Sequence, residues 1–401
     1  MGSSVGVRRY AIAVGLAATT LATGCSGPIF RYGQREAPDA GSDELVADKL
    51  EPRPIVQAVV APRVISGGTL LVLTRTPGLV AVADSDRDEL SIVDVNQAQL
   101  IHRNLLAPGD EPGRLVEDGA GLVHVVLRGG GAIGTLSPNS DEPITRREVC
   151  PAPRGIAWDS ATDLLHVACA GGELVSLRAA GGGPVRTLRL HPDLRDVVVD
   201  GDHLLVSTLR DASVAVVTAQ GSVGQRVRPA IQKDGRGGEW SATGGYRLIA
   251  LPTGGALLLH QAALTSSVTD RAGDPYYGGW GVVTNGIVAT TASVFRADEE
   301  PAAFGLLAAA PVTLDAALSP DGKEIALVSP ATRFGEGPFA PPLQRLQVFP
   351  VGAWASAQRL DTVNGRALAV RQVPAATGQL VAVAYADDGT ILVQSLSLIH
   401  I

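Results

Sequence analysis

The sequence predicts an all-β fold, a β-propeller of about seven four-stranded blades, with six or eight blades as the alternatives and a last blade that is either complete or cut short at the C-terminus. The apolar runs have four to seven residues, a length typical of strands and too short for helices. The 47 glycines and 26 prolines lie mostly between these runs, where tight turns are expected. The runs also repeat with a period of about 41 residues. Four antiparallel strands in each repeat make a propeller blade, and a ring of blades hides most sheet edges.

Two independent markers carry this period through four consecutive repeats. Equivalent valines stand 43, 42 and 39 residues apart, at Val82, Val125, Val167 and Val206. A second apolar run follows each valine after a polar or glycine-rich turn, with intervals of 41, 41 and 40 residues, at Ile92, Ile133, Leu174 and Val214. Agreement between two markers makes a chance repeat improbable.

The third repeat shows the order of strands expected in a blade. Its strands are expected at Gly155–Trp158, Leu164–Ala168 and Leu174–Leu177, and a weaker fourth strand lies between repeats, at Ile144–Val149. Further strands and hairpins are expected at Tyr246–His260, Leu314–Val328, Leu346–Phe349, Ala367–Val373, Leu380–Ala384 and Thr390–Gln394. The propeller is therefore expected over 55–395, and 262–310 exceeds one period and predicts an insertion.

The N-terminus has the features of an export signal. Arg8 and Arg9 precede an apolar run, Tyr10–Leu21, which is too short to span a bilayer. The run ends in Leu21-Ala-Thr-Gly-Cys25, which resembles a bacterial lipobox, where the signal is cut before a cysteine that is then acylated. We predict a signal peptide over 1–24, a lipidated Cys25 and a polar, flexible tether over 25–54. The alternative is an ordinary signal peptide with an incidental cysteine.

These features predict an exported protein that is lipid-anchored to the cell envelope. Several acyl chains hold a protein stably on a membrane, where one chain would be marginal. Ser26, rather than an aspartate, follows the cysteine, which is compatible with the outer membrane. The net charge is −7, and it becomes −9 without Arg8 and Arg9. An acidic chain of this kind argues against a nucleic-acid partner, because phosphates need a basic face.

The repeats resemble the YVTN family of β-propellers, whose blades pair a Ser-Pro-Asp-Gly turn with an aromatic-Val-x-Asn strand. Ser319–Gly322 matches that turn. His124-Val125 and His166-Val167 stand at the aromatic-Val position, with histidine in place of tyrosine, and the asparagine is not kept. The resemblance covers about 70–395 and implies a propeller architecture, with little about function.

A narrower resemblance is to propeller lipoproteins of myxobacteria and their relatives. It rests on Asp193–Asp200, Leu204–Ser207, Leu259–Gln261 and Tyr276–Gly279. In many proteins of this kind the propeller precedes a c-type cytochrome or di-haem peroxidase-like region. The resemblance therefore implies haem c in a downstream region that is missing from this chain. Leu396–Ile401 resembles the translated end of a sequencing adapter, so we expect 396–401 to be non-native and the natural chain to continue past Ser395.

No catalytic, cofactor or metal site is predicted within the chain itself. A covalent haem needs Cys-x-x-Cys-His, which neither Cys150 nor Cys169 begins. The sequence contains no Gly-x-Ser-x-Gly or His-Glu-x-x-His motif. His124 and His166 could be metal ligands, but a repeated packing position explains them without a metal. Asp84–Asp88 lacks the spacing of a calcium loop and is expected to be a solvated turn.

Cys150 and Cys169 are predicted to form a disulfide. They are the two cysteines left after lipidation of Cys25, and the compartment outside the cytoplasm is oxidising. Cys150 precedes the first strand of a blade and Cys169 ends the second, so a hairpin that turns near Ala161 brings them together. The alternative is a pair of buried free thiols.

Aromatic residues in and near the predicted insertion form a candidate binding face. They are Trp240, His260, Tyr276, Tyr277 and Trp280. Aromatic loops above the centre of a propeller can bind a ligand or a protein. The simpler interpretation, which we favour, is a loop that packs over its own blades.

The leading hypothesis for function is a non-catalytic scaffold that binds a protein partner or a fused domain through a face of the propeller. One alternative is the propeller portion of a periplasmic c-type haem protein. Another is a propeller enzyme such as a lactonase, which would need a ring of inward carboxylates and a central metal. The repeat-equivalent positions in this chain are apolar residues or histidine.

Overall fold

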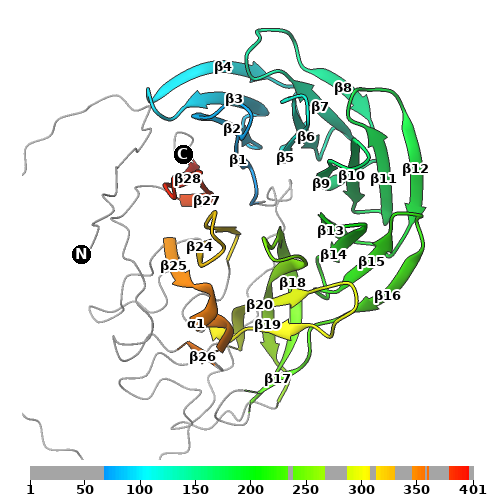
Figure 1. Ribbon diagram of the computed structural model, residues 1–401, viewed down its shortest axis with the longest axis vertical. Coiled ribbons are helices and arrows are strands. Elements are labelled where there is room, and N and C mark those ends of the chain that lie inside the picture. Colours follow the sequence, from blue (N-terminus) through cyan, green and yellow to red (C-terminus); the bar gives the residue numbers. More distant parts are fainter. Residues whose placement is uncertain are drawn as a thin grey trace, which may run out of the picture. The chain divides into compact units, whose positions relative to one another are not determined.

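The computed structural model confirms an all-β propeller of small antiparallel sheets (Figure 1). It describes residues 67–233, 238–266, 287–307, 313–329, 346–356, 359–360 and 379–396. Within these ranges the only helix is α1 (Val351–Ser356), and no helix has the length and apolarity needed to cross a bilayer.

The first four sheets each have four strands, arranged in sequence order. The first contains β1 (Leu70–Val72), β2 (Leu79–Asp84), β3 (Glu89–Asp94) and β4 (Gln99–Leu105). The second contains β5 (Pro112–Glu117), β6 (Val123–Leu127), β7 (Ala132–Leu136) and β8 (Thr145–Glu148). The third contains β9 (Pro153–Asp159), β10 (Leu164–Cys169), β11 (Glu173–Arg178) and β12 (Pro184–Arg189). The fourth contains β13 (Leu194–Asp200), β14 (His203–Thr208), β15 (Val214–Thr218) and β16 (Val223–Val227).

Three further sheets complete the described part of the ring. The fifth contains β17 (Gln232–Lys233), β18 (Glu239–Ala250), β19 (Ala256–Leu264), β20 (Val288–Phe295), β21 (Ala302–Ala303), β22 (Leu306–Leu307) and β26 (Arg359–Leu360). The sixth contains β23 (Asp315–Leu318), β24 (Glu324–Val328) and β25 (Leu346–Pro350). The seventh has two described strands, β27 (Gln379–Tyr385) and β28 (Ile391–Leu396).

The fifth sheet occupies part of the segment that we predicted to be an insertion. Residues 287–307 form β20, β21 and β22, and 267–286 lie outside the described residues. This blade is longer than the average repeat of about 41 residues, in part because its strands β18 and β19 have 12 and 9 residues. The predicted strand at Ala367–Val373 also lies outside the described residues.

Burial falls from the middle of each blade to its outer strand. All five residues of β6 are buried, whereas β4, β8, β12 and β16 are largely exposed or half-buried. Apolar clusters lie between neighbouring blades; one joins Leu90 and Ile92 to Val125 and Leu127. Packing between the faces of successive sheets therefore holds the blades together, as in any stack of two-sided apolar sheets.

The first and last blades meet and close the ring. The innermost strands follow one another around the centre, and β27 contacts β1 (Figure 1). The Thr69 hydroxyl donates to Oε1 of Gln394 at 2.7 Å, and Nε2 of Gln394 donates to the Ala83 carbonyl at 2.8 Å. These bonds join residues more than 300 positions apart in the sequence, so closure depends on the whole ring.

Candidate functional site: arginine side chains at the centre of the ring

Three consecutive blades place an arginine in a β-bulge at the start of the innermost strand. Arg114, Arg154 and Arg195 lie where the register shifts between β5 and β6, β9 and β10, and β13 and β14. A bulge re-aims a side chain out of the regular alternation of a strand. In the fifth blade, Arg247 follows a register shift that leaves Tyr246 without a ladder partner in β19. Figure 1 shows β5, β9, β13 and β18 around the centre.

We call the set of Arg114, Arg128, Arg154, Arg195 and Arg247 the central arginine cluster. Arg128 joins it because it follows the last residue of β6, Leu127, which pairs with Pro112 at the start of β5. Arg114, Arg154 and Arg195 recur at intervals of 40 and 41 residues, which is the period of the repeat. That spacing is a signal for this cluster in the sequence, which the pattern of apolar residues does not reveal.

Two buried aspartates hold part of the cluster together. Arg114 Nη2 lies 3.1 Å from Asp196 Oδ2, and Arg247 Nη1 lies 3.4 Å from the same oxygen. Arg247 Nε lies 3.3 Å from Asp315 Oδ1. Because Asp196 belongs to the fourth blade and Asp315 to the sixth, these ion pairs join the second, fourth, fifth and sixth blades.

The same two aspartates accept hydrogen bonds from the next blade's backbone. Asp196 Oδ2 accepts from the Leu248 amide at 3.1 Å, and Asp315 Oδ2 accepts from the Val383 amide at 3.1 Å. Both carboxylates are almost fully buried, so these bonds offset part of the cost of removing the charge from water. Each aspartate therefore anchors the innermost strand of its own blade to that of the following blade.

The Tyr246 carbonyl is a second meeting point for the arginines. It accepts from Arg114 Nη2 at 2.9 Å and from Arg195 Nε at 3.4 Å. Arg114 Nη1 also donates to the carbonyl of Gly67, just before β1. The carbonyl is available to them because Tyr246 lies in the irregular part of β18, outside the regular ladder.

Burial and repulsion between like charges lower the pKa values of Arg114, Arg195 and Arg128. Burial is the main cause for Arg114, whose pKa falls to about 9, and repulsion by Arg247 adds to it. Burial also lowers the pKa of Arg195 to about 10, against the attraction of Asp196. The pKa of Arg128 is lowered by burial first and then by Arg154. The fold therefore keeps several like charges close together in poorly hydrated surroundings.

Arg154 differs from its neighbours in the cluster. It is half-buried, and it makes no hydrogen bond or ion pair with the residues that the structure describes. Its charge nevertheless acts on Arg128 and Arg195, lowering the pKa of each. Arg154 is thus a guanidinium at the centre of the ring whose donors remain available.

Two histidines at equivalent positions of the second and third repeats are buried, hydrogen-bonded rings. His124 lies 2.8 Å from the Thr135 hydroxyl and 2.9 Å from Asp118 Oδ2. His166 lies 2.9 Å from the Ser176 hydroxyl and 4.0 Å from an Asp159 carboxylate oxygen. A hydroxyl, an imidazole and a carboxylate in this order are also the parts of a hydrolytic triad.

The surroundings of the Asp118–His124–Thr135 group indicate a structural role, in which the side chains connect neighbouring strands. His124 has no exposed surface, and its pKa is lowered mainly by burial. Asp118 follows β5, His124 is in β6 and Thr135 is in β7, so the group ties three strands of one blade. Among the described residues no three His, Cys, Asp or Glu side chains are grouped in a way that could hold a metal ion.

The candidate aromatic binding face is only partly described. Trp240 is 2 % exposed and His260 is 1 % exposed, so both belong to the interior of the fifth blade. His260 Nε2 lies 2.9 Å from the Ser293 hydroxyl, across the β19–β20 pair. Trp240 packs in a cluster with Ala262, Ala289 and Leu306. Tyr276, Tyr277, Trp280 and Cys25 lie outside the described residues.

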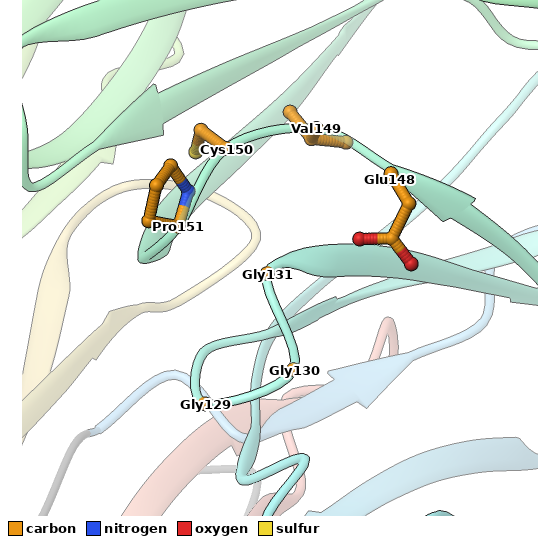
Figure 2. Close-up of a pocket in the computed structure, with 7 residues that line it drawn as sticks. All are labelled: Gly129, Gly130, Gly131, Glu148, Val149, Cys150 and Pro151. Carbon is orange, nitrogen blue, oxygen red and sulfur yellow. The ribbon is translucent and has the colours of Figure 1, made fainter.

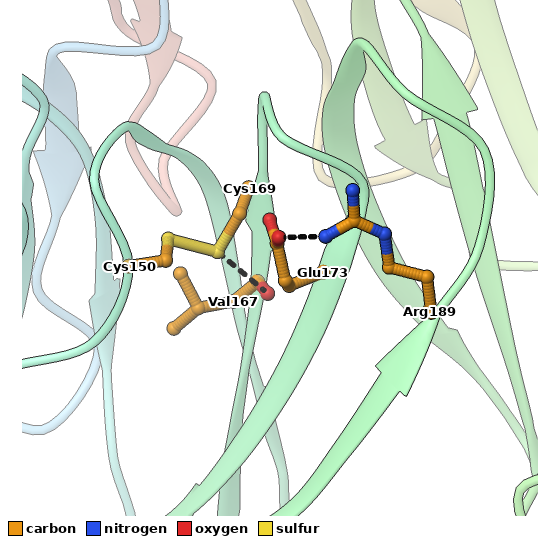
Figure 3. The surroundings of a disulfide bond; sticks show 5 residues. All are labelled: Cys150, Val167, Cys169, Glu173 and Arg189. Atoms are coloured by element: carbon orange, nitrogen blue, oxygen red, sulfur yellow. Dashed lines mark hydrogen bonds and ion pairs between the residues drawn. A yellow bond between two sulfur atoms is a disulfide. The ribbon is translucent and has the colours of Figure 1, made fainter.

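Cys150 and Cys169 are joined by a disulfide in the structure, with Cα atoms 6.4 Å apart (Figure 3). The bridge connects the segment before β9 to the end of β10 and has the Glu173–Arg189 ion pair beside it. Cys150 also borders a hollow of about 510 Å³ (Figure 2). Its lining residues are Gly129, Gly130, Gly131, Glu148, Val149, Cys150 and Pro151.

Comparison with known proteins supports the fold and leaves the family open. No protein-family model matches the chain, and no curated protein matches it. The resemblance to YVTN repeats and to myxobacterial lipoproteins therefore stays a prediction.

Several solved structures are similar in architecture. A chain of hydrazine synthase from Kuenenia stuttgartiensis has a TM-score of 0.62 and 14 % identity, over 86 % of this chain and all of its own. A chain of the mitotic checkpoint complex has a TM-score of 0.52 and 13 % identity, over 88 % and 96 %. A streptogramin B lyase has a TM-score of 0.50 and 11 % identity, over 82 % and 91 %. At these identities the likeness establishes the fold alone, and the chain is a β-propeller protein.

Proposed function

We propose that this protein is a non-catalytic propeller of the cell envelope that binds a partner protein, or a domain fused to it, through a face of the ring. The observation that best supports a binding platform is the Asp196 carboxylate, which holds Arg114 of the second blade and Arg247 and the Leu248 amide of the fifth. Ion pairs across several blades favour a ring whose faces keep their shape, and a pre-organised surface loses less entropy on binding.

The similar structures are consistent with either a binding or a catalytic role. Their names include a checkpoint complex as well as a synthase and a lyase. A propeller fold therefore does not select one class, and the choice depends on the site. In the described part of this chain, the buried carboxylates at the centre are engaged by arginines and backbone amides, which favours a structural role for them.

The envelope location rests on the N-terminal sequence. Cys25 follows an apolar run with two arginines before it, and a lipidated cysteine at that position would hold the ring at a membrane surface. Metabolic labelling with a clickable fatty acid tests this directly. We expect label on the wild-type protein and on the control Ser26→Ala, and none on Cys25→Ala. Label that persists in Cys25→Ala would contradict anchoring at this residue.

Partner binding is tested by site-specific photo-crosslinking in intact cells. Arg210, 88 % exposed after β14, and Asp202, 81 % exposed before β14, place a crosslinking residue at opposite ends of that strand. Arg103 on the outer strand β4, 57 % exposed, is the matched control. We expect a discrete adduct from Arg210 or Asp202 and none from Arg103. Adducts from neither end of β14, or from Arg103 alone, would contradict binding through a face.

A further inference from the structure

Three residues of the central arginine cluster lie at the same end of neighbouring innermost strands, where Gly155 beside Arg154 packs against the backbone of Asp196 beside Arg195. Arg154 and Arg195 lie in the bulges near the starts of β9 and β13, and Arg128 follows β6 beside the start of β5. The three residues come from the second, third and fourth blades, which are consecutive in the ring. These three arginines make a local concentration of positive charge, although the chain as a whole has a net charge of −7.

Carboxylates lie near two of these arginines. Arg128 Nη2 lies 3.8 Å from Glu111 Oε2, and Asp196 attracts Arg195. Repulsion by Arg154 nevertheless affects the pKa of Arg128 more than the attraction of Glu111 does. Arg154 itself makes no ion pair with any residue that the structure describes. Keeping like charges together in poorly hydrated surroundings costs free energy, and an added negative charge would offset this cost.

The chemistry of the side chains identifies the kind of ligand that fits. A guanidinium presents parallel N–H donors that match the paired oxygens of a carboxylate or phosphate. Arg154 is half-buried, so its donors can reach a ligand that enters from solvent, while the buried Arg128 and Arg195 add positive charge behind it. Gly155, the next residue, packs against the Asp196 backbone, which fixes the strand that carries Arg154.

We propose that Arg154, with Arg128 and Arg195, binds an oxyanion with carboxylate or phosphate groups at the centre of the ring. This site goes beyond the proposed function, because anion binding requires neither the lipid anchor nor a protein partner. The bulges that carry Arg154 and Arg195 then have a role in ligand binding, as bulges beside functional sites often do. The neighbouring ion pairs of Arg114 and Arg247 with Asp196 remain structural and hold the site in shape.

Isothermal titration of the full chain with inorganic phosphate and, separately, with citrate tests the proposal and distinguishes the two sources of oxyanion. We expect the wild-type protein to bind at least one of these anions, and Arg154→Gln to bind it at least tenfold more weakly. Arg154→Lys should be intermediate, because lysine keeps the charge and loses the paired donors. The matched control is Arg189→Gln, since Arg189 is 68 % exposed on the outer strand β12, and it should bind as the wild type does.

Two further measurements keep the result independent of folding. Without phosphate or citrate, Arg154→Gln should unfold at the same temperature as the wild type or higher, since the substitution removes repulsion. On the wild-type chain, the bound anion should slow the modification of Arg154 by phenylglyoxal, as followed by mass spectrometry, and leave that of Arg189 unchanged. Failure of both anions to bind the wild type, or equal binding by Arg154→Gln, would overturn the proposal.

Discussion

The Arg114 guanidinium of the second blade lies 3.1 Å from the Asp196 carboxylate of the fourth, and each side chain is 3 % exposed. Asp196 also lies 3.4 Å from Arg247 and accepts a hydrogen bond from the Leu248 amide. One buried carboxylate therefore joins three blades. Its negative charge also offsets the cost of burying the Arg114 guanidinium, since an unpaired buried charge costs several kcal/mol.

Asp196→Asn is expected to destabilise the protein strongly. The amide keeps the size of the side chain and removes the charge that faces Arg114 and Arg247. Breaking a buried ion pair by removing one partner costs about 3–5 kcal/mol. Chemical unfolding measures this loss, and Asp202→Asn is the matched control, because Asp202 is 81 % exposed. Equal unfolding midpoints for the two variants would show that the pairs of Asp196 contribute little.

Gly155→Ala is expected to destabilise the contact between the third and fourth blades. A Cβ at this position would lie 2.6 Å from the Asp196 Cα and 3.0 Å from the Val197 amide nitrogen. Both are backbone atoms, so the two innermost strands would have to separate, and such overpacking costs about 1–3 kcal/mol. A Cβ at Gly183 would meet no atom within 4 Å, so Gly183→Ala is the control for thermal unfolding. An unchanged midpoint for Gly155→Ala would contradict the close approach.

Reduction of the Cys150–Cys169 bridge is expected to lower stability by about 3 kcal/mol, because the loop it closes spans about 20 residues. Cys169 is fully buried, so after reduction its thiol should react with an alkylating reagent only when the blade opens. Unfolding of the wild type and of Cys150→Ser, each with and without reductant, measures the effect, which should appear only in the wild type. Alkylation of both cysteines in the denatured, unreduced protein would show that no bridge forms in cells.

Stability is expected to fall as the pH drops from about 6.5 to about 4, in part because of two buried histidines. Burial lowers the pKa of His166 and of His260 to about 4. In the unfolded chain both would titrate near their ordinary pKa of about 6.5, so the unfolded state binds more protons in this window. Protonation therefore favours unfolding as the pH falls, and the contribution of these groups is constant above about 6.5.

Replacement of either histidine should flatten this pH dependence. His260→Asn should reduce the slope of unfolding free energy by up to about 1.4 kcal/mol per pH unit between the two pKa values. Denaturant unfolding at several pH values provides the measurement, and the exposed His191, as His191→Asn, is the control. A slope in His260→Asn that matches the wild type would mean that folding does not lower the pKa of His260.

Much of the architecture was predictable from short-range patterns. The equivalent valines Val125 and Val167 lie in the buried strands β6 and β10, where the repeat placed them. The hairpin of the third repeat was also predictable, because strand length, alternation and turn residues are local properties. The burial of Trp240 and His260 depends on contacts between β18, β19 and β20, which composition does not reveal.

The sequence by itself determined the order of the strands in the first four blades, since a repeat of about 41 residues specifies one blade after another. It also contained the spacing of Arg114, Arg154 and Arg195. Only the tertiary structure decided that these arginines meet, because closure of the ring turns equivalent positions in separate blades into neighbours around one centre. The bulges that change the direction of these side chains depend on strand register. The ion pair of Arg114 with the buried Asp196 depends on contact between distant blades. Local sequence patterns predict neither of these long-range relations.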